Sequence, residues 1–215
     1  FHLFTHAMFK ALLFLGAGCI IHAVHSNEMS AMGGLRRYMP VTHATFLIAC
    51  LAIAGIWPLS GFFSKDEILT ACFAFSPVMG WVMTGIAGLT AFYMFRLYYN
   101  IFWGRENREL HAAHRPHEAP LTMTLPLLFL SAVTCVAGFI PFGKLVSSDG
   151  TAYAIHIDRG VAGVSLCVAA AAIALATWMY LRERQTVADA LATRFRGLHK
   201  AAYHRFYIDE VYQFV

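Results

Sequence analysis

The chain has 215 residues, of which 59% are hydrophobic and only 13% are charged, and its mean hydropathy is +0.58. Soluble globular domains carry about 25% charged residues, so this composition excludes that class. The formal net charge of +4 does not indicate nucleic-acid binding, because such a protein needs basic residues on a soluble face with aromatic platforms between them.

Several apolar segments are long enough to cross a membrane, because a bilayer core about 30 Å thick needs roughly 20 apolar residues per helix. A membrane β-barrel would instead show strict alternation over segments of about 10 residues, and this alternation is missing from the apolar runs. We therefore predict an all-α integral membrane protein, a multi-span helical bundle with one discontinuous helix. The expected spans are residues 1–24, 42–75, 78–103, 120–142 and 160–182.

The first span contains three titratable side chains on one helix face. His2, His6 and Lys10 follow one another at intervals of four residues. Imidazole titrates near neutral pH and a desolvated lysine can also lose its proton there, so the stripe indicates a proton relay. Packing alone is the simpler interpretation. A zinc site is disfavoured because no glutamate stands between the histidines and no thiolate is near, so no metal is expected.

The second span is too long for one straight helix. Residues 42–75 would extend about 51 Å at 1.5 Å per residue, so something must interrupt them. Pro58 lacks an N–H group and Gly61 tolerates unusual backbone angles, which predicts a break near 58–61. Broken helices are tolerated at membrane depth where they border protein or a hydrated cavity, as at the ion sites of transporters.

Ser64-Lys65-Asp66-Glu67 follows this break inside an apolar segment. Charges at such depth are costly and mark an ion path, so Lys65 is the predicted central proton carrier. Asp66 and Glu67 project from other sides of the helix, and either could hold Lys65 charged or bind a neighbouring helix. The alternative is that residues 42–60 span alone and 64–67 form a helix start in water.

The remaining candidates have simpler explanations. The five cysteines lie within apolar spans without Cys-x-x-Cys spacing, so we expect buried free thiols. Arg96 can extend to the interface beside neighbouring tyrosines. Of the other histidines, three flank span ends, at His22, His25 and His43. Three more fall in a polar loop, at His111, His114 and His117.

The loops differ in charge. Ten lysines and arginines fall in 25–41, 104–119 and the tail after Arg184, whereas the other side receives only Lys144 and Arg159. The first side should therefore be cytoplasmic. In the tail, 183–215, Val187, Leu191, Phe195 and Leu198 recur at helical spacing, which predicts an amphipathic helix on the membrane surface or packed on a partner subunit. Both chain ends look like cuts in a longer protein.

Three segments, residues 1–18, 57–67 and 206–212, resemble subunit L of the proton-pumping NADH:quinone oxidoreductase, the counterpart of mitochondrial NADH dehydrogenase subunit 5. The resemblance implies an antiporter-like subunit of the membrane arm of respiratory complex I, and covers its C-terminal half. Lys65 matches the lysine of the second broken helix. His2, His6 and Lys10 match the polar residues linking that lysine to the middle of the subunit.

The resemblance also implies what this chain lacks: the earlier broken helix with its own lysine, and the long lateral helix after the Phe-Tyr-x-Asp-Glu motif. No cofactor is expected in this chain, since FMN, iron–sulfur clusters and quinone belong to other subunits. Its implied partners are other membrane-arm subunits, the lipid bilayer of the bacterial inner membrane, and protons, which it translocates. A sodium/proton antiporter complex, or a structural role without transport, are the alternatives.

Overall fold

The computed structural model describes residues 1–107, 115–140, 157–181 and 186–213. These residues form helices and turns without any strand, which confirms the predicted all-α class. The order along the chain is α1 (His2–Val24), η1 (Met29–Ala31), η2 (Leu35–Arg37), α2 (Pro40–Ala54), α3 (Ser60–Phe75), α4 (Pro77–Phe102), α6 (Leu121–Val136), η3 (Ala137–Phe139), α8 (Arg159–Tyr180), α9 (Thr186–Arg194), α10 (Arg196–Tyr203), η4 (Arg205–Tyr207) and α11 (Ile208–Gln213).

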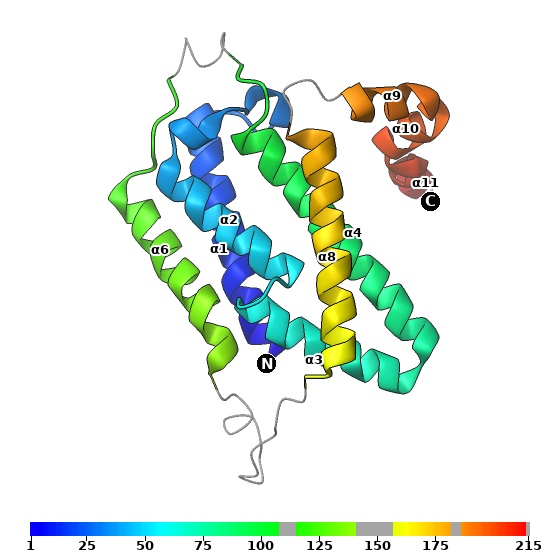
Figure 1. Cartoon of the computed structure of the whole chain (residues 1–215). Helices are drawn as coiled ribbons and strands as arrows, with labels where there is room; N and C mark the ends of the chain where they lie inside the picture. Colours follow the sequence, from blue (N-terminus) through cyan, green and yellow to red (C-terminus); the bar gives the residue numbers. More distant parts are fainter. Residues whose placement is uncertain (108–114, 141–156, 182–185, 214–215) are drawn as a thin grey trace.

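Four helical segments in the described part of the chain are long and apolar enough to cross a membrane: α1, α4, α6 with η3, and α8. The helices α2 and α3 have 15 and 16 residues, so they are about 22 and 24 Å long and each is shorter than a bilayer core. Figure 1 shows α1, α2 and α6 side by side, with α4 and α8 packed together across from them. The pair α2 and α3 is the predicted discontinuous helix.

The packing of α4 with α8 depends on small residues. The buried face of α8 repeats alanine every seven residues, at Ala162, Ala169 and Ala176, and on α4 a β-carbon at Gly88 would lie 2.6 Å from the Val168 side chain. Small residues allow two helix backbones to approach closely, which is the usual means of helix association where the solvent is as apolar as the side chains.

The break between α2 and α3 covers residues 55–59. Gly55 ends α2 in the left-handed conformation, with φ of 80°, and its N–H and that of Ile56 bond back to the Ala52 and Leu51 carbonyls. This arrangement is the usual way a glycine terminates a helix. The peptide bond between Trp57 and Pro58 is cis.

The predicted break residues are therefore half correct. Pro58 lies in the connection, but Gly61 lies in the first turn of α3, and the glycine that ends α2 is Gly55. Gly61 has a different task. A β-carbon there would stand 1.8 Å from the Ala52 carbonyl oxygen, so the absence of a side chain lets the start of α3 cross the end of α2 in direct backbone contact.

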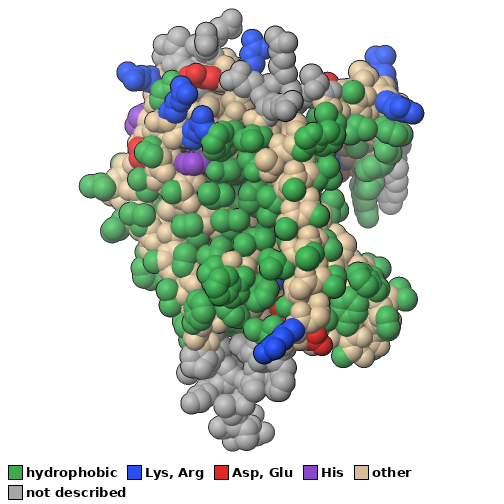
Figure 2. Space-filling model, in the orientation of Figure 1, with side chains coloured by type: hydrophobic (Ala, Val, Ile, Leu, Met, Phe, Trp, Pro, Cys, Tyr) green, Lys and Arg blue, Asp and Glu red, His purple; other side chains and the backbone are tan. Residues whose placement is uncertain are grey.

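The loops at one end of the bundle are held by carboxylates. Glu118 accepts hydrogen bonds from the Val41 N–H at 2.7 Å and from the Thr42 hydroxyl at 2.6 Å. Its negative charge also interacts favourably with the positive end of the α2 dipole. Glu106 accepts a bond from the Tyr38 hydroxyl at 2.7 Å, and this bond raises the pKa of Tyr38. Figure 2 shows lysines and arginines at the two ends and hydrophobic side chains over the middle.

Replacing Gly61 by alanine should destabilise the fold, because the added methyl group overlaps the Ala52 carbonyl and the two half-helices must separate. We expect a loss of about 1–3 kcal/mol, measured from the unfolding of the detergent-solubilised chain. The control is Gly85→Ala in α4, where no atom lies within 4 Å of the new methyl group. Equal stability of the two variants would contradict the packing role of Gly61.

Candidate proton-carrying site

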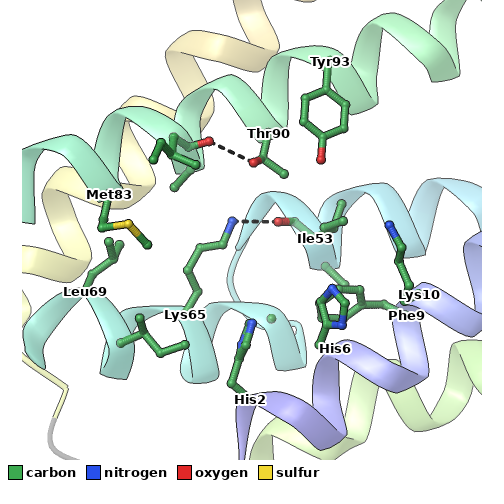
Figure 3. Close-up of a pocket in the computed structure, with 15 residues that line it drawn as sticks. His2, His6, Phe9, Lys10, Ile53, Lys65, Leu69, Met83, Thr90 and Tyr93 are labelled. Atoms are coloured by element: carbon green, nitrogen blue, oxygen red, sulfur yellow. Dashed lines mark hydrogen bonds between the residues drawn. The ribbon is translucent and has the colours of Figure 1, made fainter. Parts of the chain in front are cut away.

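A cavity of about 260 Å³ lies where α3 begins, between α1, α2, α3 and α4. Its lysine and histidine side chains come from α1 and α3, and α4 forms the opposite wall (Figure 3). A space of this size has room for several water molecules. The lining consists of His2, His6, Phe9, Lys10, Ala52, Ile53, Gly61, Lys65, Ile68, Leu69, Met83, Ile86, Ala87, Thr90 and Tyr93.

Lys65 extends from α3 back to the end of α2. Its ammonium group donates a hydrogen bond of 2.8 Å to the backbone carbonyl of Ile53, drawn as a dashed line in Figure 3. In a continuous helix that carbonyl would accept the N–H of the residue four positions later, which here is Trp57, in the break. The glycine cap satisfies the carbonyls of Leu51 and Ala52, so Ile53 is left for the lysine.

His2 is fixed by two buried hydroxyl groups. Its Nδ1 lies 3.0 Å from the Ser64 hydroxyl, and the Thr5 hydroxyl lies 2.8 Å from the same Ser64 oxygen and 3.1 Å from the His2 carbonyl. When Thr5 donates to Ser64, the proton of Ser64 is available for Nδ1. The cluster therefore connects α1 directly to the residue that precedes Lys65.

The other two members of the predicted stripe line the same cavity but are less tightly held. The rings of His2 and His6 are 5.7 Å apart between centroids, and Lys10 is exposed, with its ammonium 5.5 Å from the centre of the Phe14 ring. The structure thus gathers His2, His6, Lys10 and Lys65 around one space. Proton transfer between them requires bridging water, because no direct hydrogen bond joins them among the described contacts.

Asp66 does not belong to this cavity. Successive residues of a helix are about 100° apart, so the carboxylate points away from the side where Lys65 lies. It is 1% exposed, and neither of its oxygens has a hydrogen-bond partner among the described residues. Asp66 thus projects from another side of α3 than Lys65, as the sequence predicts, and its membership of a proton relay stays a prediction. Glu67 also lies outside the cavity lining.

The alternative in which residues 64–67 form a helix start in water is also wrong. Ser64 is fully buried, as is Asp66, whereas a solvated first turn would expose both. The cap residue of α3 is Leu59, and no side chain caps the helix. Burial of two polar residues in the first turns of a helix is instead consistent with a protein-lined site at membrane depth.

The remaining candidates are placed as follows. Groups of three or more metal-ligating side chains do not occur in the described part of the chain. Cys19 and Cys50 are buried, but Cys72 and Cys135 are only partly so and Cys167 is exposed, because α8 turns most of its surface outward. His43 contacts the Tyr98 hydroxyl at 2.7 Å, and Arg96 lies over the Tyr180 ring.

Several sequence candidates lie outside the described residues. These are His111, His114, Arg108, Lys144 and Arg184, and the last two residues of the tail.

Sequence reasoning missed two parts of the site, Thr5 and the carbonyl of Ile53. A polar residue three positions after His2 in an otherwise apolar span was a usable signal for Thr5, since the two share a helix face. The Ile53 carbonyl had no such signal, because it depends on where α2 ends.

Comparison with known proteins covers the whole chain. Residues 1–90 match the transmembrane family described as NADH:quinone oxidoreductase/Mrp antiporter. The chain is 39% identical to NAD(P)H-quinone oxidoreductase chain 5 of Picosynechococcus sp., over 99% of this chain and 38% of the relative. It is 35% identical to NADH-quinone oxidoreductase subunit L of Rickettsia bellii, over all of this chain and 36% of the relative.

The chain belongs to the subunit L/5 family of NADH:quinone oxidoreductases. It spans a little over a third of the length of these relatives. The resemblance noted from three sequence segments is thereby confirmed, and with it the membrane class of the protein. A third relative, subunit 5 from the chloroplast of Mesostigma viride, is 34% identical over the whole chain and over 36% of its own length.

In this subunit L/5 chain, Ser64→Ala should loosen the α1–α3 contact. The variant removes the hydrogen-bond partner of His2 and one of the two acceptors of Thr5, so we expect a loss of about 1–2 kcal/mol in the free energy of unfolding. Ser131→Ala is the matched control, because that buried hydroxyl bonds only to its own helix backbone, at Leu128. Equal free energies of unfolding for the two variants would contradict the structural role of Ser64.

Proposed function

We propose that this chain translocates protons across a membrane as a subunit of an NADH:quinone oxidoreductase, driven by electron transfer in other subunits. The observation that carries the proposal is the position of Lys65, whose ammonium group sits at a helix break, 2.8 Å from a freed carbonyl and beside a cavity with room for water. A proton carrier needs contact with water on one side and a protein environment that can alter its affinity for the proton on the other.

His2, His6 and Lys10 extend this proposal from Lys65 along α1. They line the same cavity, and His2 is oriented by Ser64, the neighbour of Lys65. A charge change at the Lys10 end would act on Lys65 through the intervening water and imidazole groups. The coupling is thus electrostatic and requires no redox group in this chain. FMN, iron–sulfur clusters and quinone belong to other subunits in this proposal, and the partners are the neighbouring membrane-arm subunits.

We place the chain in a bacterial inner membrane with the tail after residue 183 on the cytoplasmic side. Supporting this orientation, the loops after α1 and α4 lie at one end of the bundle, and α8, which begins with Arg159, starts at the other end (Figure 1). Positive loops favour the cytoplasm.

A sodium/proton antiporter complex is the second candidate, because the matched family also includes Mrp antiporters. It would use the same lysine without a dehydrogenase. Proton uptake driven by a sodium gradient in the absence of NADH would favour this candidate. A structural role without transport predicts that charge removal at Lys65 leaves proton flux intact.

Replacing Lys65 by methionine should lower proton flux through this subunit by about 100-fold, the typical contribution of a positioned proton-transfer group. Lys65→Arg should also be impaired, because a guanidinium does not release its proton near neutral pH. Both are measured as protons pumped per NADH oxidised in membrane vesicles containing the whole complex. Glu67→Gln, on the same helix but outside the cavity, is the control. An arginine variant that pumps normally would leave Lys65 as a fixed charge.

Lys10→Met tests the relay along α1, because it keeps the length of the side chain and removes its charge. Pumping should fall while the complex stays assembled, since Lys10 is exposed and supports no buried contact. The two readouts are proton flux and the amount of intact complex on native gels. A parallel loss of assembly and flux would support a packing role.

The orientation is tested by placing a cysteine at Asn107, in the loop after α4. A membrane-impermeant maleimide added outside intact cells should label it no more than it labels the unmodified chain. Labelling above that level would reverse the topology.

A further inference from the structure

The helices after α8 expose large apolar side chains. Phe195, between α9 and α10, is 55% exposed, and Leu198 in α10 is 62% exposed. The predicted amphipathic helix is therefore present but interrupted at Phe195, which leaves helical geometry with ψ of 39°. Exposed apolar groups that cluster in this way mark a surface that binds a partner or a membrane.

The same two helices carry a basic face. Arg196 and Lys200 are four residues apart, so they lie on one side of α10, whereas Leu198 is about 200° from Arg196 and faces the other side. Arg194 stands at the end of α9. No ion pair involves these three cations among the described residues, although Arg205 further along the tail pairs with Asp209.

The position of the tail fixes it near the end of the membrane-spanning region. The span α8 ends at Tyr180, and Trp178, two residues before this end, is 61% exposed, as expected of an interfacial aromatic residue. The path from Tyr180 to Thr186 is six residues, so α9 begins at most about 22 Å from the end of the span. Figure 1 places α9 to α11 beside this end of α8.

The two faces of the tail are also oriented consistently. Figure 2 shows its lysine and arginine side chains on the outer side, at the level of the other basic residues of that end. Its hydrophobic side chains lie below them, toward the level of the spans. A basic outer face above an apolar inner face is the arrangement of a helix that lies in the headgroup layer of a membrane.

We propose that α9 and α10 form an interfacial anchor that recognises anionic lipid headgroups through Arg194, Arg196 and Lys200. The apolar residues Phe195 and Leu198 enter the boundary between headgroups and acyl chains, and the three cations face the phosphate layer. This inference is independent of proton translocation and concerns only how the end of the chain is held. Anionic lipid is the favoured occupant because α9 and α10 together carry three cations and a single anion, Asp189.

The test places a nitroxide spin label at Leu198 through Leu198→Cys, in a full-length chain whose five native cysteines are replaced by alanine. The chain is reconstituted in nanodiscs of phosphatidylcholine, with or without phosphatidylglycerol. Contact of the label with oxygen should rise, and contact with a water-soluble nickel chelate should fall, when phosphatidylglycerol is present. The ratio of membrane-bound to free tail should change by about fivefold for each cation engaged, and less in high salt.

The combined variant Arg194→Gln, Arg196→Gln and Lys200→Gln should abolish the difference between the two lipids, whereas Arg159→Gln at the opposite end should leave it unchanged. Equal accessibility of the label in both lipids would overturn headgroup recognition. A label that stays in water in both nanodiscs, and is protected only in the assembled complex, would show that the surface binds a protein subunit and would also overturn the proposal.

Discussion

The backbone carbonyl of Ile53 is the group on which the site depends, because a carbonyl at membrane depth must find a donor. The chain ends α2 one residue later and supplies Lys65 from the next helix as that donor, at 2.8 Å. A single contact thus satisfies the break and fixes the ammonium beside the cavity. If the lysine gives up a proton, the neutral amine can still donate to the carbonyl, so the contact holds the side chain in either state.

The helix α3 separates two polar environments. Lys65 faces water-sized space and imidazole groups, whereas Asp66 points to another side, where its carboxylate is buried without a hydrogen-bond partner in the described chain. Opposite charges one residue apart in sequence therefore do not form an ion pair in this structure. This leaves Lys65 hydrogen-bonded to a neutral carbonyl, which stabilises its charge less than a carboxylate would.

Much of this arrangement followed from the sequence, because its physical causes are local. Span length and apolar composition require helices, a 34-residue apolar element requires a break, and four-residue spacing places His2 and His6 on one face. The failures concern three-dimensional relations. Glycine permits both bending and close approach, and only the position of Ala52 shows that Gly61 serves close approach. The buried surroundings of Asp66 likewise depend on which elements pack against its face of α3, and adjacency to Lys65 in the sequence does not fix them.

The carboxylate of Glu118 holds the first residues of α2, and the far end of the same helix carries the carbonyl that binds Lys65. A helix about 22 Å long transmits displacement along its axis with little compression, because its hydrogen bonds run parallel to that axis. The helix α2 therefore links the segment before α6 to the cavity that holds Lys65. Movement of the loop that carries Glu118 would therefore displace the Ile53 carbonyl, the acceptor of Lys65, from the opposite end of α2.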